Sequence, residues 1–238
     1  MFREYVAQLI EYGKKFIILG NVNALTYKEI FPLIKDNKIW FGASIHSGDR
    51  KFYVPDDYPL NASGCGTDKD GRKFIRVKGV RWYTNIDYSA RHKDLETTYL
   101  YSKKDELYPD LYKKYDNYNA INVDKTNEIP MDYPGVMGVP ITFFDKYNPD
   151  QFEIVGLAPE RLAENESKFQ TKRYINAIQH KKDGTTCSGN KVNDGPAILH
   201  DKQPNKYPYY TSETVNGKFI EVLYARILIK KKQKKEDK

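Results

Sequence analysis

Two asparagines stand directly after a short apolar run, and their amides are the first candidates for binding chemistry in this sequence. The run at residues 16–20, FIILG, is typical of a strand, and Asn21 and Asn23 follow its carboxyl end. Since α/β sheets bind ligands at the carboxyl ends of their parallel strands, these amides are expected to line a ligand pocket. Asparagine also suits a turn between a strand and a helix, so a structural role is the alternative.

The residue types that usually hold metals are not spaced for a metal site. The chain has two cysteines and four histidines, namely Cys65, Cys187, His46, His92, His180 and His200. No histidine pair shows the i, i+4 spacing of a zinc helix, and no metal is predicted. Two distant cysteines favour a reducing cytoplasm over a disulfide scaffold. No run approaches the roughly 20 apolar residues that cross a bilayer, so no membrane association is expected.

Charge and aromatic content favour a polyanionic partner. Lysine and arginine total 39 against 32 acidic residues, which gives a net charge of +7, and the chain has 20 tyrosines. Rings interleaved with cations suit stacking on bases and contacts to phosphates. The alternative is a merely basic protein, in which most of these cations are solvated.

The elements that must position these residues begin as an α/β alternation. Helical spacing of apolar residues over 2–12, followed by Gly13, predicts a helix that stops there. The all-apolar run at 16–20 predicts a strand covered on both faces in a parallel sheet. Thr26 and Glu29 have the spacing of a capping box, which predicts a helix to about Asp36, and residues 39–42 predict a second strand.

Later segments follow a different pattern. Asp70-Gly71 predicts a turn leading into antiparallel strands over residues 73–85. Residues 88–119 are polar and tyrosine-rich, so irregular structure with one short helix is expected. Strands are predicted at 119–123 and 152–158, with a turn and a short helix between them, and Asn216-Gly217 predicts a hairpin. No G-x-G-x-x-G or Walker lysine motif occurs in the chain.

Long strings of the sequence resemble a known enzyme family. FREYVAQLIEYGKKFIILGNVNALTYKEIFPLIKDNKIWFG, VKGVRWYTNID and GVMGVPITFFDKYNPDQFEIVG are similar, in the same order, to the carboxyl-terminal part of the EcoRI-type adenine-specific DNA methyltransferases. The resemblance runs from Phe2 to about Leu157. It implies a doubly wound α/β domain that binds S-adenosylmethionine, a target-recognition region, and methyl transfer to N6 of a flipped adenine in double-stranded DNA.

The resemblance also implies an incomplete enzyme. The family's Asn-Pro-Pro-Phe motif and its glycine-rich cofactor loop occur nowhere in the 238 residues. We therefore expect the carboxyl-terminal part of the catalytic domain at 1–87, a mixed α+β recognition region at 88–229 and a basic tail at 230–238. Such a chain is expected to be inactive alone, with the missing amino-terminal half as a partner. A non-catalytic DNA-binding module is the alternative, and a sheet edge exposed near Phe16 would favour association instead.

Within that framework the candidate residues fall into two sets. The candidates for the pocket of the flipped base are Asn21, Asn23, Trp82, Tyr83 and Asn85. Tyr83-Thr84-Asn85 resembles the element that packs near the target base in adenine methyltransferases, although these rings suit a core strand equally well. The candidates for DNA contacts are Arg81, Arg91, His92, Lys93, Lys103, Lys104, Lys113 and Lys114.

Overall fold

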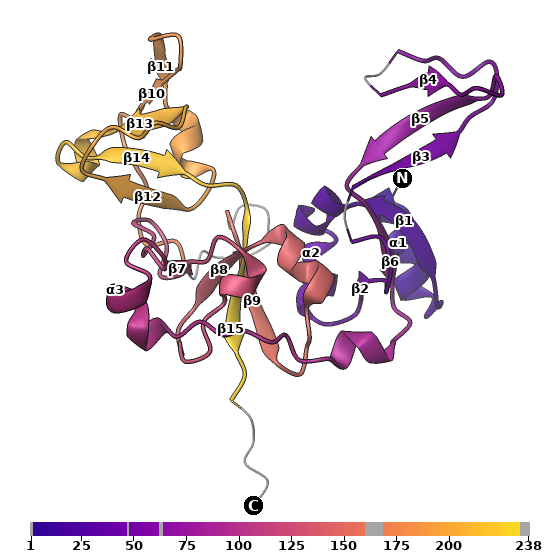
Figure 1. Cartoon of the computed structure of the whole chain (residues 1–238), viewed down its shortest axis with the longest axis horizontal. Helices are drawn as coiled ribbons and strands as arrows, with labels where there is room; N and C mark the ends of the chain where they lie inside the picture. The colour runs from indigo at the N-terminus through magenta and orange to yellow at the C-terminus, as the bar shows by residue number, and fades with distance from the viewer. Residues whose placement is uncertain (1, 47, 62–63, 160–168, 234–238) are drawn as a thin grey trace, which may run out of the picture.

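The computed structural model describes residues 2–46, 48–61, 64–159 and 169–233, and its elements gather into four small sheets (Figure 1). The α-helices are α1 (Phe2–Glu11), α2 (Phe31–Lys35) and α3 (Lys104–Leu107). The short 3-10 helices are η1 (Val22–Thr26), η2 (Ser89–His92), η3 (Tyr101–Lys103), η4 (Thr126–Glu128), η5 (Ile141–Lys146), η7 (Asn190–Asn193) and η8 (Glu213–Val215). The mixture of helices and sheets confirms an α/β fold.

The first sheet is antiparallel rather than parallel. Its order is β1 (Ile17–Asn21), β6 (Val80–Thr84), β2 (Trp40–Phe41), and β6 pairs antiparallel with both neighbours. Strands β1 and β2 therefore run in the same direction, as the alternation of helix and strand predicted. The strand that separates them comes from much later in the chain, which local sequence patterns do not reveal.

Strand β1 is an edge strand, and the prediction that both its faces are covered is wrong. Ile17 is 58% exposed and Leu19 40% exposed, whereas Phe16 just before the strand is only 6% exposed. Because side chains alternate along a strand, Ile17 and Leu19 share one face, and that face carries no cover among the described residues. The apolar run reflects an open face here, not a doubly covered one.

The first helix is confirmed, and the second begins later than predicted. Helix α1 ends before Gly13, whose φ of +60° needs a residue without a β-carbon. The hydroxyl of Thr26 donates to the carbonyl of Asn23 at 2.8 Å, so Thr26 closes η1 and does not form a capping box. Helix α2 begins at Phe31, which places Pro32 in the first turn, where its missing N–H costs nothing.

Residues 49–78 form a separate three-stranded sheet that we call the arm. Its order is β3 (Asp49–Tyr53), β5 (Lys73–Lys78), β4 (Gly66–Thr67), all antiparallel. The predicted Asp70-Gly71 turn is confirmed between β4 and β5, with Gly71 at φ +80°. The strands over 73–85 do not pair with each other, however. Gly79, at φ +68°, turns the chain so that β5 lies in the arm and β6 in the first sheet.

The third sheet is completed by a strand from the end of the described chain. Its order is β7 (Ile121–Asn122), β8 (Met137–Pro140), β15 (Arg226–Lys231), β9 (Phe152–Ala158). Strand β9 is confirmed over its predicted length, and β8 was not predicted. Lys230 and Lys231 pair with Glu153 and Phe152, so the first residues of the expected tail are strand residues.

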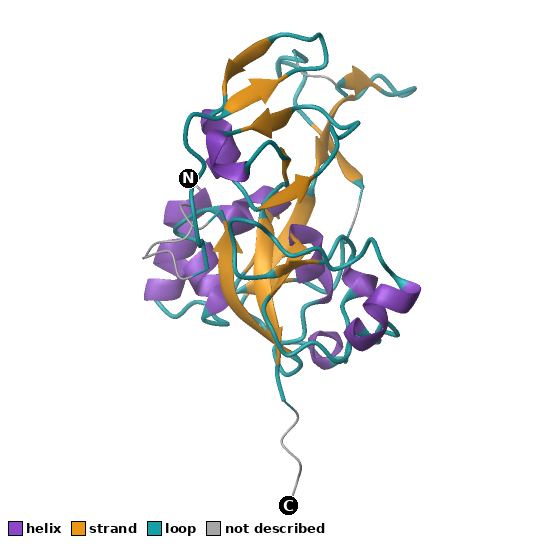
Figure 2. Cartoon of the chain, turned by 90° about the vertical axis from the view of Figure 1, so that its left-hand side faces the viewer, coloured by secondary structure: helices purple, strands orange, loops and turns teal. Residues whose placement is uncertain are grey.

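The fourth sheet lies at the opposite end of the molecule from the arm, and both rise from the same side of the body (Figure 1). Its order is β11 (Thr186–Ser188), β10 (Ile178–His180), β13 (Tyr209–Thr211), β14 (Phe219–Val222), β12 (Ala197–His200). The predicted hairpin is confirmed, because β13 pairs with β14 across Asn216 and Gly217, both at positive φ. Figure 2 shows most of the helices below this sheet.

One hydrophobic core crosses the boundary that we placed at residue 87. Buried Val6 and Leu25 belong to the same cluster as Met137 and Ile229. Residues 1–87 therefore share their core with the third sheet and do not pack as an independent unit. Among the described residues, no helix is long and apolar enough to cross a membrane.

Candidate functional site

The two asparagines after β1 are used to join the first sheet to the arm. The side-chain oxygen of Asn21 accepts from the N–H of Asn23 at 2.9 Å, and its amide nitrogen donates to the carbonyl of Lys78 at 3.0 Å. The N–H of Val22 also donates to the carbonyl of Gly79 at 2.6 Å. Asn21 thus caps η1 and holds the base of the arm, and Asn23 supplies backbone to that cap.

The aromatic and amide candidates on β6 also have internal partners. Tyr83 is fully buried between the rings of Phe2 and Phe41, and its hydroxyl donates to the carbonyl of Asn21 at 2.8 Å. Burial raises the pKa of the Tyr83 hydroxyl far above its ordinary value. The amide of Asn85 accepts from the N–H of Phe16 at 3.1 Å and donates to the carbonyl of Lys14 at 2.8 Å. The side chains of Tyr83 and Asn85 therefore both have structural roles.

Trp82 lies on the other face of β6 from Tyr83. It is half-buried and lies across from Leu19 of β1. A β-carbon on Gly42 would lie 2.8 Å from the β-carbon of Trp82, so the strand end approaches it closely. Of the five base-pocket candidates, the structure therefore brings Asn21, Asn23 and Tyr83 together and separates Trp82 from them.

Arg81 lies in a buried ion pair that we call the joint. Its Nε lies 2.6 Å from Oδ1 of Asp145 and its Nη2 lies 2.9 Å from Oδ2, which is the bidentate geometry that guanidinium favours. The two side chains are only 5% and 8% exposed. Since Asp145 belongs to η5, the joint fastens β6 to the segment after β8. Arg81 has no surface left for a phosphate.

Arg91 is also inside the protein. Its guanidinium lies 4.0 Å from the centre of the Trp40 ring, and its Nη1 lies 3.2 Å from Oδ1 of Asp87. Its Nη2 donates to the amide oxygen of Asn37. With its side chain only 4% exposed, Arg91 packs on Trp40 and is not available to the DNA backbone.

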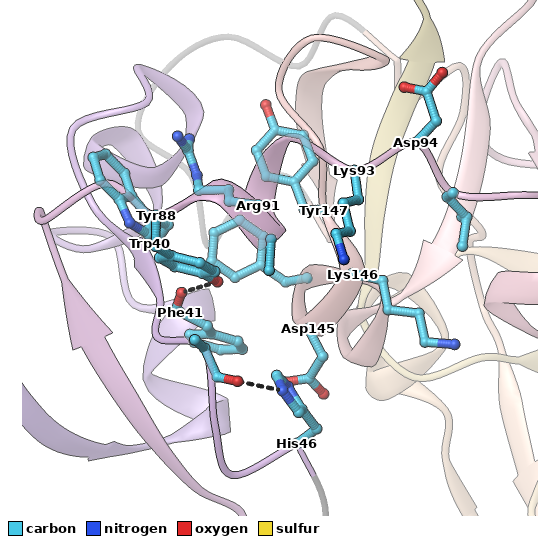
Figure 3. A pocket seen from close by; sticks show the side chains of 14 residues that line it. Trp40, Phe41, His46, Tyr88, Arg91, Lys93, Asp94, Asp145, Lys146 and Tyr147 are labelled. Atoms are coloured by element: carbon cyan, nitrogen blue, oxygen red, sulfur yellow. Dashed lines mark hydrogen bonds and ion pairs between the residues drawn. The ribbon is translucent and has the colours of Figure 1, made fainter.

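A cavity of about 230 Å³ lies beside the joint, between β2 and the segments at 88–95 and 144–147 (Figure 3). Its walls combine rings and charges: Trp40, Phe41, Tyr88, Phe144, Tyr147, His46, Arg91, Lys93, Asp94, Asp145 and Lys146. The hydroxyl of Tyr88 donates to the carbonyl of Phe41 at 2.8 Å, and burial raises the pKa of Tyr147 to about 12. Both phenols therefore stay neutral, and the cavity offers planar apolar walls with mixed charges at its rim.

His92 is held between two carboxylates. Its Nδ1 lies 2.5 Å from Asp150 and its Nε2 lies 2.9 Å from Asp87. The hydrogen bonds to Asp150 and then to Asp87 raise the pKa of the imidazole, and the hydrogen bond from His92 lowers the pKa of Asp87. Two negative charges around one cation leave the group net negative, which opposes a phosphate contact there.

The lysines among the DNA candidates lie at or near the surface. Lys103 is 3.2 Å from Glu106, Lys104 is 2.5 Å from Asp105, and Lys113 is 3.9 Å from Asp110. Lys93 lies at the rim of the cavity, and Lys114 forms an isolated antiparallel β-bridge with Ile121. These five remain accessible to a polyanion, although three of them have acidic neighbours.

The segment GVMGVPITFFDKYNPDQFEIVG supplies partners that sequence reasoning missed. Asp145 pairs with Arg81 and Asp150 with His92, while Gln151 bonds both the N–H and the carbonyl of Leu95, at 2.7 and 2.9 Å. Gly138 lies in β8 and not in a turn. A β-carbon at this position would lie 2.4 Å from the hydroxyl of Tyr115. The only signal for these partners was that the string carries polar side chains, Asp145, Asp150 and Gln151 among them, between aromatic and aliphatic ones.

The residues after β1 do not fit S-adenosylmethionine. Such a cofactor needs a cradle of open backbone N–H groups and polar side chains, but the amide of Asn21 and the N–H of Val22 are already bonded to protein atoms. These groups are therefore not free to hold the cofactor. No group of three or more metal-ligating side chains occurs among the described residues either.

Comparison with known proteins places the chain in a family. The profile described as adenine-specific methyltransferase EcoRI matches residues 1–232. Type II methyltransferase M.EcoRI of Escherichia coli is 52% identical over 155 residues, which cover 65% of this chain and 46% of that protein. Type II methyltransferase M.MpnI of Mycoplasma pneumoniae is 35% identical over 177 residues, which cover 74% of this chain and 54% of that protein.

A third relative gives the same picture. Type II methyltransferase M.MgeORF184P of Mycoplasma genitalium is 39% identical over 158 residues, covering 65% of this chain and 48% of its own length. The chain thus spans about half the length of the curated relatives it matches. No solved structure matches. The family profile extends through the fourth sheet to β15, and the chain belongs to the EcoRI family of adenine-specific methyltransferases.

Proposed function

We propose that this chain serves the site-specific methylation of adenine N6 in double-stranded DNA, with S-adenosylmethionine as the methyl donor, and that it supplies the DNA-recognition part of that reaction. The observation that carries the proposal is the family match over residues 1–232, which includes all four sheets. The positive net charge of +7 supports a polyanionic substrate.

The residues of this chain do not supply the transfer chemistry in this proposal. Attack by N6 on a methyl group needs acceptors that hold the hydrogens of the amino group, as the family's Asn-Pro-Pro-Phe motif provides. That motif is absent from the 238 residues, and the side-chain amides of Asn21 and Asn85 are occupied by backbone groups. The chain alone is therefore proposed to bind DNA and not to methylate it.

The surface lysines carry the electrostatic part of the proposal. Lys93, Lys103, Lys104, Lys113 and Lys114 are proposed to contact phosphates, which set affinity and register without reading sequence. Arg81, Arg91 and His92 leave this set, because burial or paired carboxylates occupy them. Trp82, which is half-buried on the face of β6 opposite Tyr83, and the exposed Asn23 remain the base-pocket candidates.

Methyl transfer from labelled S-adenosylmethionine to duplex DNA tests the proposal. The chain is assayed alone and together with a polypeptide that covers the half of M.EcoRI outside the matched region. We expect no incorporation with the chain alone and incorporation of label at adenine with both polypeptides together.

Two outcomes contradict the proposal in different ways. Label incorporated by the chain alone would show that its own residues carry the chemistry. Binding to DNA in a salt-dependent manner, but without incorporation in any mixture, would favour a non-catalytic DNA-binding module instead. The other polypeptide, assayed without this chain, is the control for methyl transfer that does not need this chain.

A further inference from the structure

The arm has no core of its own and packs on none of the molecule's cores. None of its described residues, 49–61 and 64–78, is buried, and none belongs to a hydrophobic core cluster. A small sheet of this kind is only marginally stable in water unless something packs against it. Figure 1 shows it projecting from the body at the end of the molecule opposite the fourth sheet. Its shape points to a ligand outside the chain.

One face of the arm is built from cations and rings. Register places Lys51 opposite Arg76, Tyr53 opposite Phe74, and Asp49 opposite Lys78, and directly opposed residues share a face. Over the paired strands β3 and β5 there are five cations, Arg50, Lys51, Lys73, Arg76 and Lys78, against a single carboxylate, Asp49. Lys51, Tyr53, Arg76 and Lys78 are exposed, so this face is open to solvent.

The rings hold the cations in place. The Nζ of Lys51 lies 4.1 Å from the centre of the Phe74 ring and 4.8 Å from that of Tyr53. The guanidinium of Arg72 lies 4.3 Å from the Tyr53 ring. Stacking of this kind limits the rotamers that long side chains sample, so less entropy is lost when a ligand binds them.

The base of the arm is fixed to the first sheet. Asn21 donates to the carbonyl of Lys78, and Gly79 accepts from the N–H of Val22. At the far end, Asp68 accepts from the N–H groups of Asp70 and Arg72 at 2.9 and 3.0 Å, which closes the turn. Strands β3 and β5, which form the ribbon, are therefore fixed at both ends while their cations face solvent.

We propose that the arm binds along a groove of duplex DNA through the face of Lys51, Arg76 and Lys78, an inference that rests on the proposed function. The major groove of B-DNA is about 12 Å wide and admits a two-stranded β-ribbon, whose strands are about 4.8 Å apart. A ribbon of five residue pairs extends roughly 17 Å, which spans several phosphates on each strand. Charge complementarity favours nucleic acid over an apolar or basic protein surface, because the proposed face carries the three cations Lys51, Arg76 and Lys78 against the single carboxylate of Asp49.

Binding of the full chain to a duplex, measured by fluorescence anisotropy against salt, tests the inference. The triple variant Lys51→Ala, Arg76→Ala, Lys78→Ala is compared with the control Lys28→Ala, Lys35→Ala, Lys38→Ala, which removes the same charge from exposed positions on and around α2. Each lost phosphate contact lowers the slope of log K against log salt by about 0.9. We expect the arm variant to lose about 2–3 from the slope and on the order of tenfold or more in affinity.

Chemical protection supplies a measurement that does not depend on folding of the variant. In the unaltered chain, acetylation of Lys51 and Lys78 is expected to slow several-fold when the duplex is added, while Lys28 and Lys35 react at unchanged rates. If the chain binds DNA, but both triple variants bind alike and Lys51 and Lys78 stay unprotected, the inference is overturned and the proposed function stands. If the unaltered chain does not bind DNA at all, the DNA-recognition role itself fails.

Discussion

The joint and the arm both contain arginines near aromatic rings, yet they use them in opposite ways. In the joint, Arg81 is 5% exposed and is held by both oxygens of Asp145. In the arm, Arg76 is 52% exposed and lies 3.6 Å from Asp49. A guanidinium that has lost its water needs a fixed counter-charge, whereas an exposed one stays available to any phosphate. Burial of the side chain, and not the residue type, therefore decides which cations can bind a ligand.

The largest effect is expected where the buried pair is broken. Asp145→Ala leaves Arg81 as an uncompensated buried charge, and we expect the free energy of unfolding to fall by about 3–5 kcal/mol. Urea denaturation measures this loss. Glu106→Ala, which breaks the exposed pair with Lys103, is the matched control and should cost about 0–1 kcal/mol.

The double variant Arg81→Met, Asp145→Met separates charge from packing. It removes both charges at once, so most of the stability lost in Asp145→Ala should return. Equal losses in the Asp145 and Glu106 variants would show that the joint is no tighter than a surface pair, and the contrast with the arm would disappear.

A pair of arginine variants compares the same stacking contact inside and outside the protein. Arg91→Leu removes a guanidinium 4.0 Å from the Trp40 ring, and we expect a loss of about 1–2 kcal/mol because that contact is desolvated. Arg72→Leu removes an exposed guanidinium 4.3 Å from the Tyr53 ring and should cost about 0.5–1 kcal/mol. Thermal unfolding of both variants measures the two losses. A larger loss of stability for Arg72→Leu than for Arg91→Leu would contradict this ranking.

His92 tests the contrast through pH, with a smaller effect because the group is exposed. Its pKa is raised by Asp150 and Asp87, so the stability it adds is present below the ordinary value of 6.5 and is lost as pH rises through the raised pKa. The lowered pKa of Asp87 adds stability above 3.8 that is lost as pH falls through the lowered value. This clamp, in which His92 is held between Asp87 and Asp150, therefore contributes most to the free energy of unfolding between about pH 4 and 6.5.

NMR titration of the imidazole checks this window. In Asp150→Asn the pKa of His92 should fall toward its ordinary value, since Asp150 is the largest cause of the rise. An unchanged titration would remove Asp150 from the clamp. Asp110→Asn, on the surface beside Lys113, is the control and should leave His92 unaffected.

The smallest effect on stability is expected in the arm. Lys78→Ala removes an exposed side chain, so the free energy of unfolding should change by no more than about 0.5 kcal/mol while DNA affinity falls. Parallel urea and anisotropy measurements on one preparation separate the two quantities. A loss of stability as large as that of Arg91→Leu would show that the Lys78 side chain supports the fold and is not simply part of the DNA-binding face of the arm.

Local patterns in the sequence predicted those elements whose causes are local. Gly13 ends α1, Gly71 turns the arm, and residues 152–158 form the expected strand. The insertion of β6 between β1 and β2 was not predictable in this way, because residues 80–84 pair with strands up to 67 positions away, from Ile17 to Thr84.

The candidate site was predictable in kind but not in detail. Arg81 and Lys78 look alike in the sequence, and only the distant Asp145 makes the first a structural residue. The arm cations were overlooked because Asp49, Asp68 and Asp70 lie close to them in the sequence. Pairing of the strands sorts most of those carboxylates to the turn and leaves the cations on the ribbon.

Strand β15 has a consequence for how the chain is made. It is an inner strand of the third sheet, between β8 and β9, although Arg226 follows Ala158 by a long stretch of sequence. A ribosome needs roughly 3–14 s to synthesise that stretch, and during this time β8 and β9 have edges without their common neighbour. The growing chain therefore exposes the apolar strands of its core until β15 has been made, and a chaperone that shields strand edges during synthesis should raise its yield more than one that acts on the released protein.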